Sequence, residues 1–510
     1  MKRLSARNIV LFFVLGLFII SCKNQENKNS GDTIPKLPII IDNYSSLTSY
    51  GQMMNYLKKV SALSKNISMN ITGESVEGRE IPLIKISNEE NIAKEKVNIF
   101  LFAQQHGDEP SGKEALLMLI DGFANGQNQS WLKKVNLLLI PQVNPDGGEK
   151  NKRKNANGDD LNRDHLVLQN PETRAVHKVF NKYLPEVTVD IHEYDPYSDY
   201  WKEFGYQKNF DIQLGFLTNL NVDKKLTDLF YKEILPYVEE DIESRGYSFF
   251  EYTLGDFPAG KRLRHSTVDI NDGRQSLGIL NSLSFIVEGK YGKDSVENLE
   301  TRTLSQCLTA KSIIEYSVKN SEMIDSLVYQ SRKKLRKASQ GEKVAIRMNH
   351  VKGNKNLKYP LKSLTTGKDT VFVVENFHSK VVSLLDVEKP SGYLIPVNDK
   401  KLVSWLKRSY LKYSKYHNKE EYTVNAYRIK HVSKSYDEGL ENYYPEVKLI
   451  SYTNKIKDLD YYYLPIDQLH SNKMALALEP QSMLGLVNYS EFNYLLEKQK
   501  IYPVLRVKRN

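Results

Sequence analysis

The sequence contains almost no cysteine. Among its 510 residues, only Cys22 and Cys307 occur, and no CxxC pair is present. Two cysteines cannot build a disulfide framework, and the missing CxxC pairs exclude the usual thiolate signature of a structural zinc site. Internal repeats are also absent. The length suggests more than one domain, and a hydrophobic fraction of 40% is enough to bury large cores.

The chain also lacks any concentrated block of charge. Its formal net charge of +10 is spread along the sequence. Basic runs such as Arg332–Lys337 are short and are typical of a solvated helix face. No known nucleic-acid-binding module accompanies these charges, so the sequence predicts no nucleic-acid partner.

Long apolar runs are missing except at the N-terminus, where Ile9–Ile20 follows Lys2, Arg3 and Arg7. This run is short for a membrane-spanning helix and has the layout of an export signal. It ends in Ile19-Ile20-Ser21-Cys22, which resembles a bacterial lipobox. An ordinary signal peptide or an anchor helix are the alternatives. The polar segment that follows at once favours a lipoprotein.

We therefore expect a lipoprotein signal peptide over residues 1–22, a lipid on Cys22 and a flexible linker over residues 23–40. The mature protein would be exported and anchored by its lipid to a bacterial membrane, facing the periplasm or the cell surface.

Apolar strands alternate with amphipathic helices up to about residue 320, which predicts an α/β domain with a mainly parallel sheet over residues 41–320. The expected strands are 81–86, 97–103, 135–141, 187–191 and one within 279–287; the expected helices are 48–63, 113–120, 171–184, 222–245 and 295–318.

The pattern changes after residue 320. Residues 321–342 are predicted to form a helical connector. Residues 343–510 contain short runs rich in tyrosine and valine, separated by turns, which indicate a smaller β-rich domain with one helix near 403–413.

The segment Gln104–Gly112 holds the first candidate site. It joins the strand 97–103 to the helix 113–120, so His106 and Glu109 lie on a strand-to-helix turn. In an open α/β sheet, ligands bind at this edge. An imidazole and a carboxylate with two residues between them can converge on one Zn²⁺. Alone, the H-x-x-E pattern is more typical of a solvated polar turn.

His106, Glu109, His192 and Glu288 all fall just beyond the carboxyl ends of apolar strands. Such a set suffices for metal-assisted hydrolysis. His106, Glu109 and His192 would hold zinc and leave one position for water. Glu288 would take the proton of that water and pass it to the leaving amine.

Other polar residues suit the same reaction. Arg153 could stabilise a tetrahedral oxyanion. Arg163, with Asn162, offers the planar donor set that a substrate carboxylate accepts. Asp160 could hold the free nitrogen of a ligand histidine.

Taken together, these motifs resemble the zinc carboxypeptidase family (the funnelin metallopeptidases) over roughly residues 45–320. The matching elements, in the family's order, are Gly73–Ile81, His106–Glu109, Asn144–Gly147, Arg153–Asn155, Asp160–Arg163, His192 and Glu288.

The resemblance implies a mixed, mainly parallel sheet of about eight strands flanked by helices, and one Zn²⁺ per chain held by His106, Glu109 and His192. It implies that Glu288 is the general acid/base, that Arg153 polarises the carbonyl and that Asn162 and Arg163 grip a C-terminal carboxylate.

The sequence departs from the family in one place. The segment 260–269 contains no tyrosine to close over the substrate, and Tyr252 is the nearest candidate upstream. Either Arg262, Arg264 or Arg274 contacts the substrate in place of that tyrosine, or these arginines lie on the protein surface. His177 is expected on the surface of its helix, and Glu193 is expected to point away from the metal site.

The leading hypothesis is a zinc metallocarboxypeptidase that acts on peptides. The alternatives are a zinc amidase or peptidoglycan-stem peptidase on the same fold, or a binding lipoprotein without catalytic activity.

Overall fold

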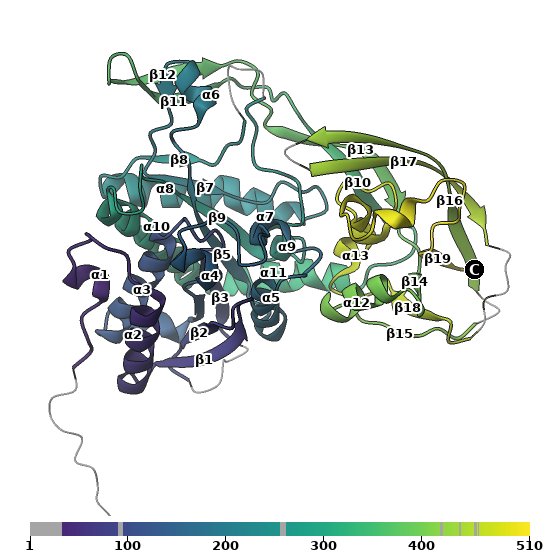
Figure 1. Ribbon diagram of the computed structural model, residues 1–510, viewed down its shortest axis with the longest axis horizontal. Helices are drawn as coiled ribbons and strands as arrows, with labels where there is room; N and C mark the ends of the chain where they lie inside the picture. The colour runs from purple at the N-terminus through teal and green to yellow at the C-terminus, as the bar shows by residue number, and fades with distance from the viewer. Residues whose placement is uncertain are drawn as a thin grey trace, which may run out of the picture.

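An eight-stranded mixed sheet forms the centre of the N-terminal part of the molecule (Figure 1). The computed structural model describes residues 33–89, 95–255, 262–418, 422–437, 440–452, 456 and 458–510. Cys22, the expected signal peptide and the first part of the expected linker lie outside the described residues. Part of the segment 260–269 lies outside them as well.

The order of the strands is β1-β2-β4-β3-β5-β9-β7-β8. The four central strands β4, β3, β5 and β9 run parallel to one another, whereas β1 and β2 pair antiparallel with their neighbours. Strand β7 pairs antiparallel with β9 and parallel with β8. This arrangement confirms the predicted mixed α/β sheet. The strands are Ile67–Glu74 (β1), Glu80–Ile86 (β2), Val97–Ala103 (β3), Val135–Ile140 (β4), Val187–Tyr194 (β5), Ile212–Gly215 (β7), Phe249–Glu251 (β8) and Leu283–Lys290 (β9).

Helices cover both faces of this sheet (Figure 1). On one face, Gly112 of α3 contacts Ile191, and α3 packs against α10. On the other face lie α5 and α9, where Gly273 of α9 contacts Asp190. The helices are Pro38–Ile41 (α1), Tyr50–Leu63 (α2), Ser111–Ala124 (α3), Pro145–Glu149 (α4), Pro171–Tyr183 (α5), Asp199–Glu203 (α6), Lys224–Leu229 (α7), Leu235–Ser244 (α8), Gly273–Gly278 (α9), Leu299–Lys319 (α10) and Ser321–Arg336 (α11).

The sequence explains these elements locally. Every side chain of β3 and of β4 is buried, as expected for parallel strands covered on both faces. Helix α2 begins with a capping box: the Ser49 side chain accepts from the Gln52 backbone nitrogen, and the Gln52 side chain accepts from the Ser49 backbone nitrogen. The helix expected over 222–245 forms as α7 and α8, which are joined by one π-helical turn, Phe230–Ile234.

The part of the chain after residue 342, here called the C-terminal region, is rich in strands (Figure 1). Six strands form one sheet in the order β15-β18-β14-β19-β16-β17, β10 pairs with β13, and β11 pairs with β12. The strands are Lys343–Val351 (β10), Leu357–Ser363 (β11), Asp369–Val374 (β12), Lys380–Glu388 (β13), Gly392–Pro396 (β14), Ser414–Lys415 (β15), Tyr422–Asp437 (β16), Leu440–Ser451 (β17), Tyr461–Pro465 (β18) and Leu505–Arg509 (β19); the helices are Lys400–Arg408 (α12) and Ser471–Leu478 (α13).

Two expected boundaries differ in the structure. Leu37 and Ile39 are buried against the core, so the flexible linker predicted over residues 23–40 ends earlier. The two-residue strand β6 (Tyr206–Gln207) pairs with β11, so the α/β part of the chain supplies the third strand of the sheet formed by β11 and β12. Among the described residues, no helix has both the length and the apolarity needed to cross a membrane.

The C-terminal region also packs directly on the α/β part. Trp405 of α12 donates from Nε1 to the Leu166 carbonyl at 3.1 Å, and Arg408 donates from Nε to the Val167 carbonyl at 2.8 Å. From α13, Lys473 donates from Nζ to the His165 carbonyl at 3.2 Å. These contacts hold the loop that follows Arg163.

Lys473 predicts a pH dependence of stability. Its side chain is 3% exposed, and burial lowers its pKa to about 7. The nearby His165, His177 and His470 have pKa values lowered by burial and do not titrate in the range where Lys473 does. An unfolded lysine has a pKa of about 10.4, so between pH 7 and pH 9 the unfolded chain holds a proton that the folded chain has released.

Stability must therefore rise with pH in this window. We expect the free energy of unfolding of the wild-type protein to increase by roughly 2 kcal/mol, relative to Lys473→Met, between pH 7 and pH 9. Urea titrations of both proteins at the two pH values measure this difference. Parallel pH dependences of the two proteins would show that Lys473 is not the titrating group.

Candidate metal centre

The loop that carries His106 and Glu109 is shaped by two glycines. A side chain on Gly107 would meet the Gly147 carbonyl carbon at 2.1 Å, so the two backbones pack with no room for a Cβ. Asn144 fixes this contact: it accepts from the Gly147 backbone at 2.9 Å and donates to the Gln105 carbonyl at 3.1 Å. The N-P-D-G turn therefore supports the H-x-x-E loop from the neighbouring strand.

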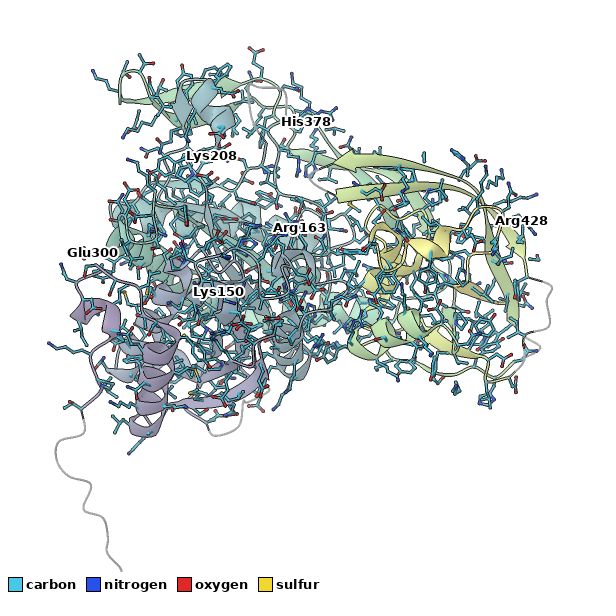
Figure 2. The ribbon with its side chains drawn as sticks, viewed as in Figure 1. Lys150, Arg163, Lys208, Glu300, His378 and Arg428 are labelled. Atoms are coloured by element: carbon cyan, nitrogen blue, oxygen red, sulfur yellow. The ribbon has the colours of Figure 1, made fainter. Side chains whose placement is uncertain are left out.

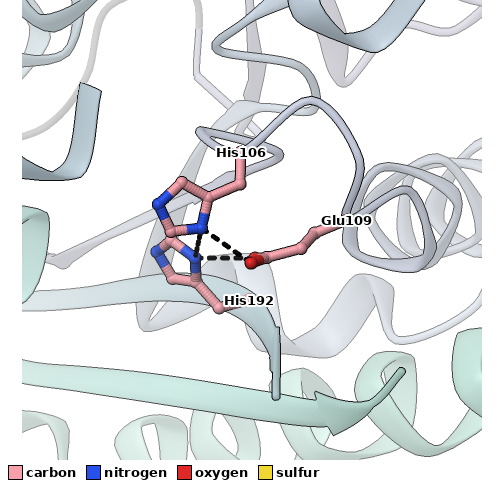
Figure 3. A group of neighbouring side chains, drawn as sticks. All are labelled: His106, Glu109 and His192. Atoms are coloured by element: carbon pink, nitrogen blue, oxygen red, sulfur yellow. Dashed lines mark hydrogen bonds and ion pairs between the residues drawn. The ribbon is translucent and has the colours of Figure 1, made fainter. Parts of the chain in front are cut away.

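His106, Glu109 and His192 converge in the structure, and their donor atoms all lie within 4.8 Å of one another (Figure 3). These three residues are called the metal group below. His106 Nδ1 is 2.7 Å from Glu109 Oε1, and His192 Nδ1 is 2.9 Å from Glu109 Oε2. The two Nδ1 atoms are 3.2 Å apart. Tetrahedral zinc with ligands at about 2.0–2.2 Å separates them by roughly 3.3–3.6 Å, so a small expansion admits the ion.

The outer nitrogen of each imidazole faces a carboxylate. His106 Nε2 lies 3.2 Å from Asp160 Oδ1, and His192 Nε2 lies 2.9 Å from Asp190 Oδ1. In the neutral rings, each Nε2 therefore carries the hydrogen and each Nδ1 presents a lone pair inwards. Two lone pairs and a carboxylate that face one another repel unless a cation lies between them. The chemistry of this donor set thus fits a divalent metal.

The carboxylates around the two histidines also shift the pKa values of the group. Burial alone would lower the pKa of His106, but the Glu109 and Asp160 carboxylates raise it overall. The pKa of His192 is raised in the same way by Asp190 and Glu109, against the effect of burial. The two imidazoles in turn hold the pKa of Glu109 well below its usual value. A pocket with this excess of carboxylates attracts positive charge.

Glu288 lies one strand away from His192. The two residues are register partners in the parallel pair β5 and β9, so their side chains rise from the same face of the sheet, with backbones about 4.8 Å apart. Burial, assisted by the Glu109 charge, raises the pKa of Glu288 to about 7. Both residues lie inside their strands, not beyond the strand ends as expected from sequence, because β5 extends to Tyr194 and β9 to Lys290.

Arg153 reaches the edge of the metal group. Its Nε and Nη2 donate to Asp160 Oδ2 at 3.1 and 3.0 Å, and its Nη1 lies 3.6 Å from Glu109 Oε1. The side chain is 44% exposed, so it is anchored by Asp160 but remains accessible from the solvent side.

Asn162 and Arg163 follow on a short 3₁₀ turn. Asn162 is buried, accepts from the Gly273 backbone at 2.8 Å and lies 3.4 Å from His192 Nε2 through its Nδ2. Arg163 is exposed and donates to the Asn162 carbonyl at 2.8 Å. Figure 2 labels Arg163 in the α/β part, on the side nearer the C-terminal region.

One residue near the site differs from expectation. Arg274 is buried, not on the surface: it donates to Ser266 Oγ, and its guanidinium lies 5.8 Å from the centre of the Tyr252 ring. Tyr252 itself extends from the end of β8 close to Glu288, and burial and that carboxylate together raise the pKa of the phenol. Glu193 points away from the metal group, as predicted, and pairs with Arg302 at 2.7 Å.

Sequence reasoning missed Asp190 and Gln105. Gln105 donates from Nε2 to both oxygens of Asp190 at 2.9 Å. Asp190 could have been found from its position, since it lies two residues before His192 in a strand and therefore shares its face. Ligand histidines usually carry such a partner. His177, expected on the helix surface, is 2% exposed and faces inwards.

The chain resembles known carboxypeptidases. Residues 53–229 match a family model described as zinc carboxypeptidase. Carboxypeptidase 2 of Trichophyton rubrum is 30% identical over 294 residues, a match that covers 55% of this chain and 54% of that protein. Carboxypeptidase 2 of Trichophyton tonsurans is 26% identical over 459 residues, which cover 85% of this chain and 81% of that protein. The chain thus spans about half the length of the first of these relatives.

A solved metallo-carboxypeptidase from Burkholderia cenocepacia is 16% identical and covers 54% of this chain and 71% of its own, with a TM-score of 0.41. This structural likeness is too weak to add to the topology described above.

The mixed α/β sheet carries at its edge a buried His/Glu/His group that could hold a metal ion. The family match includes all three of these residues and agrees with the resemblance of this part of the chain to zinc carboxypeptidases.

Proposed function

We propose that this protein is a zinc-dependent metallocarboxypeptidase that hydrolyses the C-terminal peptide bond of peptides. The convergence of the His106, Glu109 and His192 donor atoms, backed by two aspartates, carries this proposal. Zinc bound to these three side chains would lower the pKa of a water molecule to about 7 and polarise the scissile carbonyl.

The remaining chemistry falls to the protein's own side chains. Glu288 is the general base that accepts the proton of the attacking water and then, as an acid, returns it to the leaving amine. Its raised pKa suits both halves of this transfer. Arg153, held in place by Asp160, donates a hydrogen bond to the oxyanion that develops on the carbonyl.

Asn162 and Arg163 bind the carboxylate at the substrate's C-terminus. The planar guanidinium of Arg163 matches a carboxylate in two-point geometry, and its exposure leaves it free to receive one. This contact distinguishes a carboxypeptidase from an endopeptidase, because only the last residue of a peptide has a main-chain carboxylate.

We predict that Arg163→Ala lowers kcat/KM by roughly 10- to 100-fold, mainly through a higher KM. A loss of this size corresponds to the removal of one or two hydrogen bonds to a charged group. Arg163→Lys should recover only part of this loss, because an ammonium lacks the planar pair of donors. Steady-state kinetics on one short peptide measure both variants. A fall in kcat with KM unchanged would contradict a role in carboxylate binding.

One comparison tests the proposed reaction. The zinc-loaded protein is given a peptide with a free C-terminus and the same peptide as its C-terminal amide. We expect release of the last residue from the free acid and little or none from the amide. Equal hydrolysis of both peptides would reject the carboxypeptidase assignment.

We also propose that the protein is exported and held at a bacterial membrane by a lipid on Cys22. The lipobox-like segment before Cys22 and the polar residues after it support this location. Cys22→Ala should move the protein from the membrane fraction to the soluble fraction of the cells, with Cys307→Ala as the matched control. Retention of Cys22→Ala in the membrane fraction would reject lipid anchoring.

A further inference from the structure

A chain of buried polar side chains leads away from the metal group on the face of the sheet covered by α5. It begins at His192 Nε2, which faces Asp190, and passes through Gln105. Gln105 Oε1 is 2.6 Å from His165 Nε2, and His165 Nδ1 is 3.1 Å from His177 Nε2. All five side chains are nine-tenths or more buried.

The direction of every hydrogen bond in this chain is fixed. Gln105 must point its amide nitrogen at the Asp190 carboxylate, because that carboxylate only accepts. Its oxygen therefore faces His165, whose Nε2 must carry the hydrogen. His165 Nδ1 is then an acceptor, and His177 Nε2 must donate to it. Burial lowers the pKa of both histidines, which keeps them neutral and keeps this order.

The C-terminal region contacts His165, the fourth residue of this hydrogen-bonded series. Lys473 of α13 donates to the His165 carbonyl, and the His165 backbone nitrogen donates to the Asn271 carbonyl at 3.0 Å. Both the carbonyl and the backbone nitrogen of His165 are therefore hydrogen-bonded, while its ring donates to Gln105. The Lys473 contact joins residues 308 positions apart in the sequence.

From this geometry we infer that His165 and His177 are positioning residues of the metal centre, which orient the zinc ligand His192 through Gln105 and Asp190. The inference rests on the proposed zinc site and extends it: the C-terminal region, through Lys473, becomes part of the support of the metal group. Outer partners of metal ligands act in this way by fixing the tautomer and the angle of the ligand ring.

The test measures zinc affinity of the full-length protein by competition with a chromogenic chelator. His165→Leu removes the donor to Gln105 and should weaken zinc binding by about 10-fold, at the lower end of the range for outer partners. His165→Gln keeps an amide N–H at a similar reach and should restore affinity close to wild type. The absorption spectrum of the cobalt-substituted protein should change in His165→Leu and return in His165→Gln.

His470→Leu is the matched control. His470 is buried at the same interface, directly before α13, and no hydrogen bond joins its ring to this chain within the described structure. Its replacement should leave zinc affinity unchanged. His177→Leu, which removes the donor to His165, provides a second variant with an expected loss in the same direction should His165→Leu fail to fold.

The outcomes separate the two proposals. Wild-type protein that binds no zinc would reject the proposed function itself. Wild-type protein that binds zinc, with the affinities of His165→Leu and His177→Leu equal to it, would overturn the positioning role alone. A loss in His165→Leu that His165→Gln does not restore would also overturn it, because the effect would then come from packing and not from the hydrogen bond.

Discussion

Glu288→Gln is expected to lower kcat by roughly 10²–10⁴-fold while leaving zinc content unchanged. Glutamine has nearly the same shape as glutamate but cannot take a proton from water at neutral pH. Glu288 is a register partner of His192 but not one of the three converging donors, so its replacement leaves the metal group intact. Peptide hydrolysis and bound zinc are measured on the same preparation.

Glu186→Gln is the control for this variant. Glu186 directly precedes β5, at the opposite edge of the sheet, and its carboxylate accepts from the Asn98 backbone at 2.8 Å. The same chemical change there should leave kcat unaltered. Full activity of Glu288→Gln would refute the role of Glu288 as general acid/base, and loss of zinc in that variant would assign it to the metal group instead.

His192→Ala is expected to abolish stoichiometric zinc binding and, with it, peptide hydrolysis. His192 supplies one of three donors, and its removal leaves His106 and Glu109 as the remaining protein ligands. The loss of affinity should exceed the 10–100-fold that changes in outer partners cause. Zinc per chain is measured after dialysis against metal-free buffer, and activity is measured with and without added zinc.

His378→Ala is the matched control for this second variant. His378 is also buried, with its ring 3.1 Å from the His350 carbonyl, and Figure 2 shows it well above Arg163 in the molecule. It should keep wild-type zinc content. If His192→Ala retained one tightly bound zinc, the metal centre would have to be built from other residues.

The sheet was predictable from sequence because its strands are strongly apolar. Val97–Ala103 and Val135–Ile140 are buried throughout, and their observed bounds match the predicted runs within one residue. The convergence of His106 and Glu109 with His192 followed from one topological rule, that parallel strands present their carboxyl ends at a common edge.

The buried residues that surround the metal group could not be predicted in the same way. His177 was expected on a helix surface because its own helix gives no sign of its partners. His165, 12 residues before it, belongs to an irregular loop, and Lys473, which contacts that loop, comes almost 300 residues later. No local periodicity encodes such a contact. The pairing of β6 with β11 is hidden for a similar reason, since a strand of two residues has no pattern of its own.

The most direct test of the central claim is digestion of a diverse peptide pool, read by mass spectrometry, with zinc-loaded protein and with the same protein after chelation. The account predicts ladders that lose one residue at a time from the C-terminus, present with zinc and absent without it. Internal cleavage, or ladders that persist after zinc is removed, would contradict it.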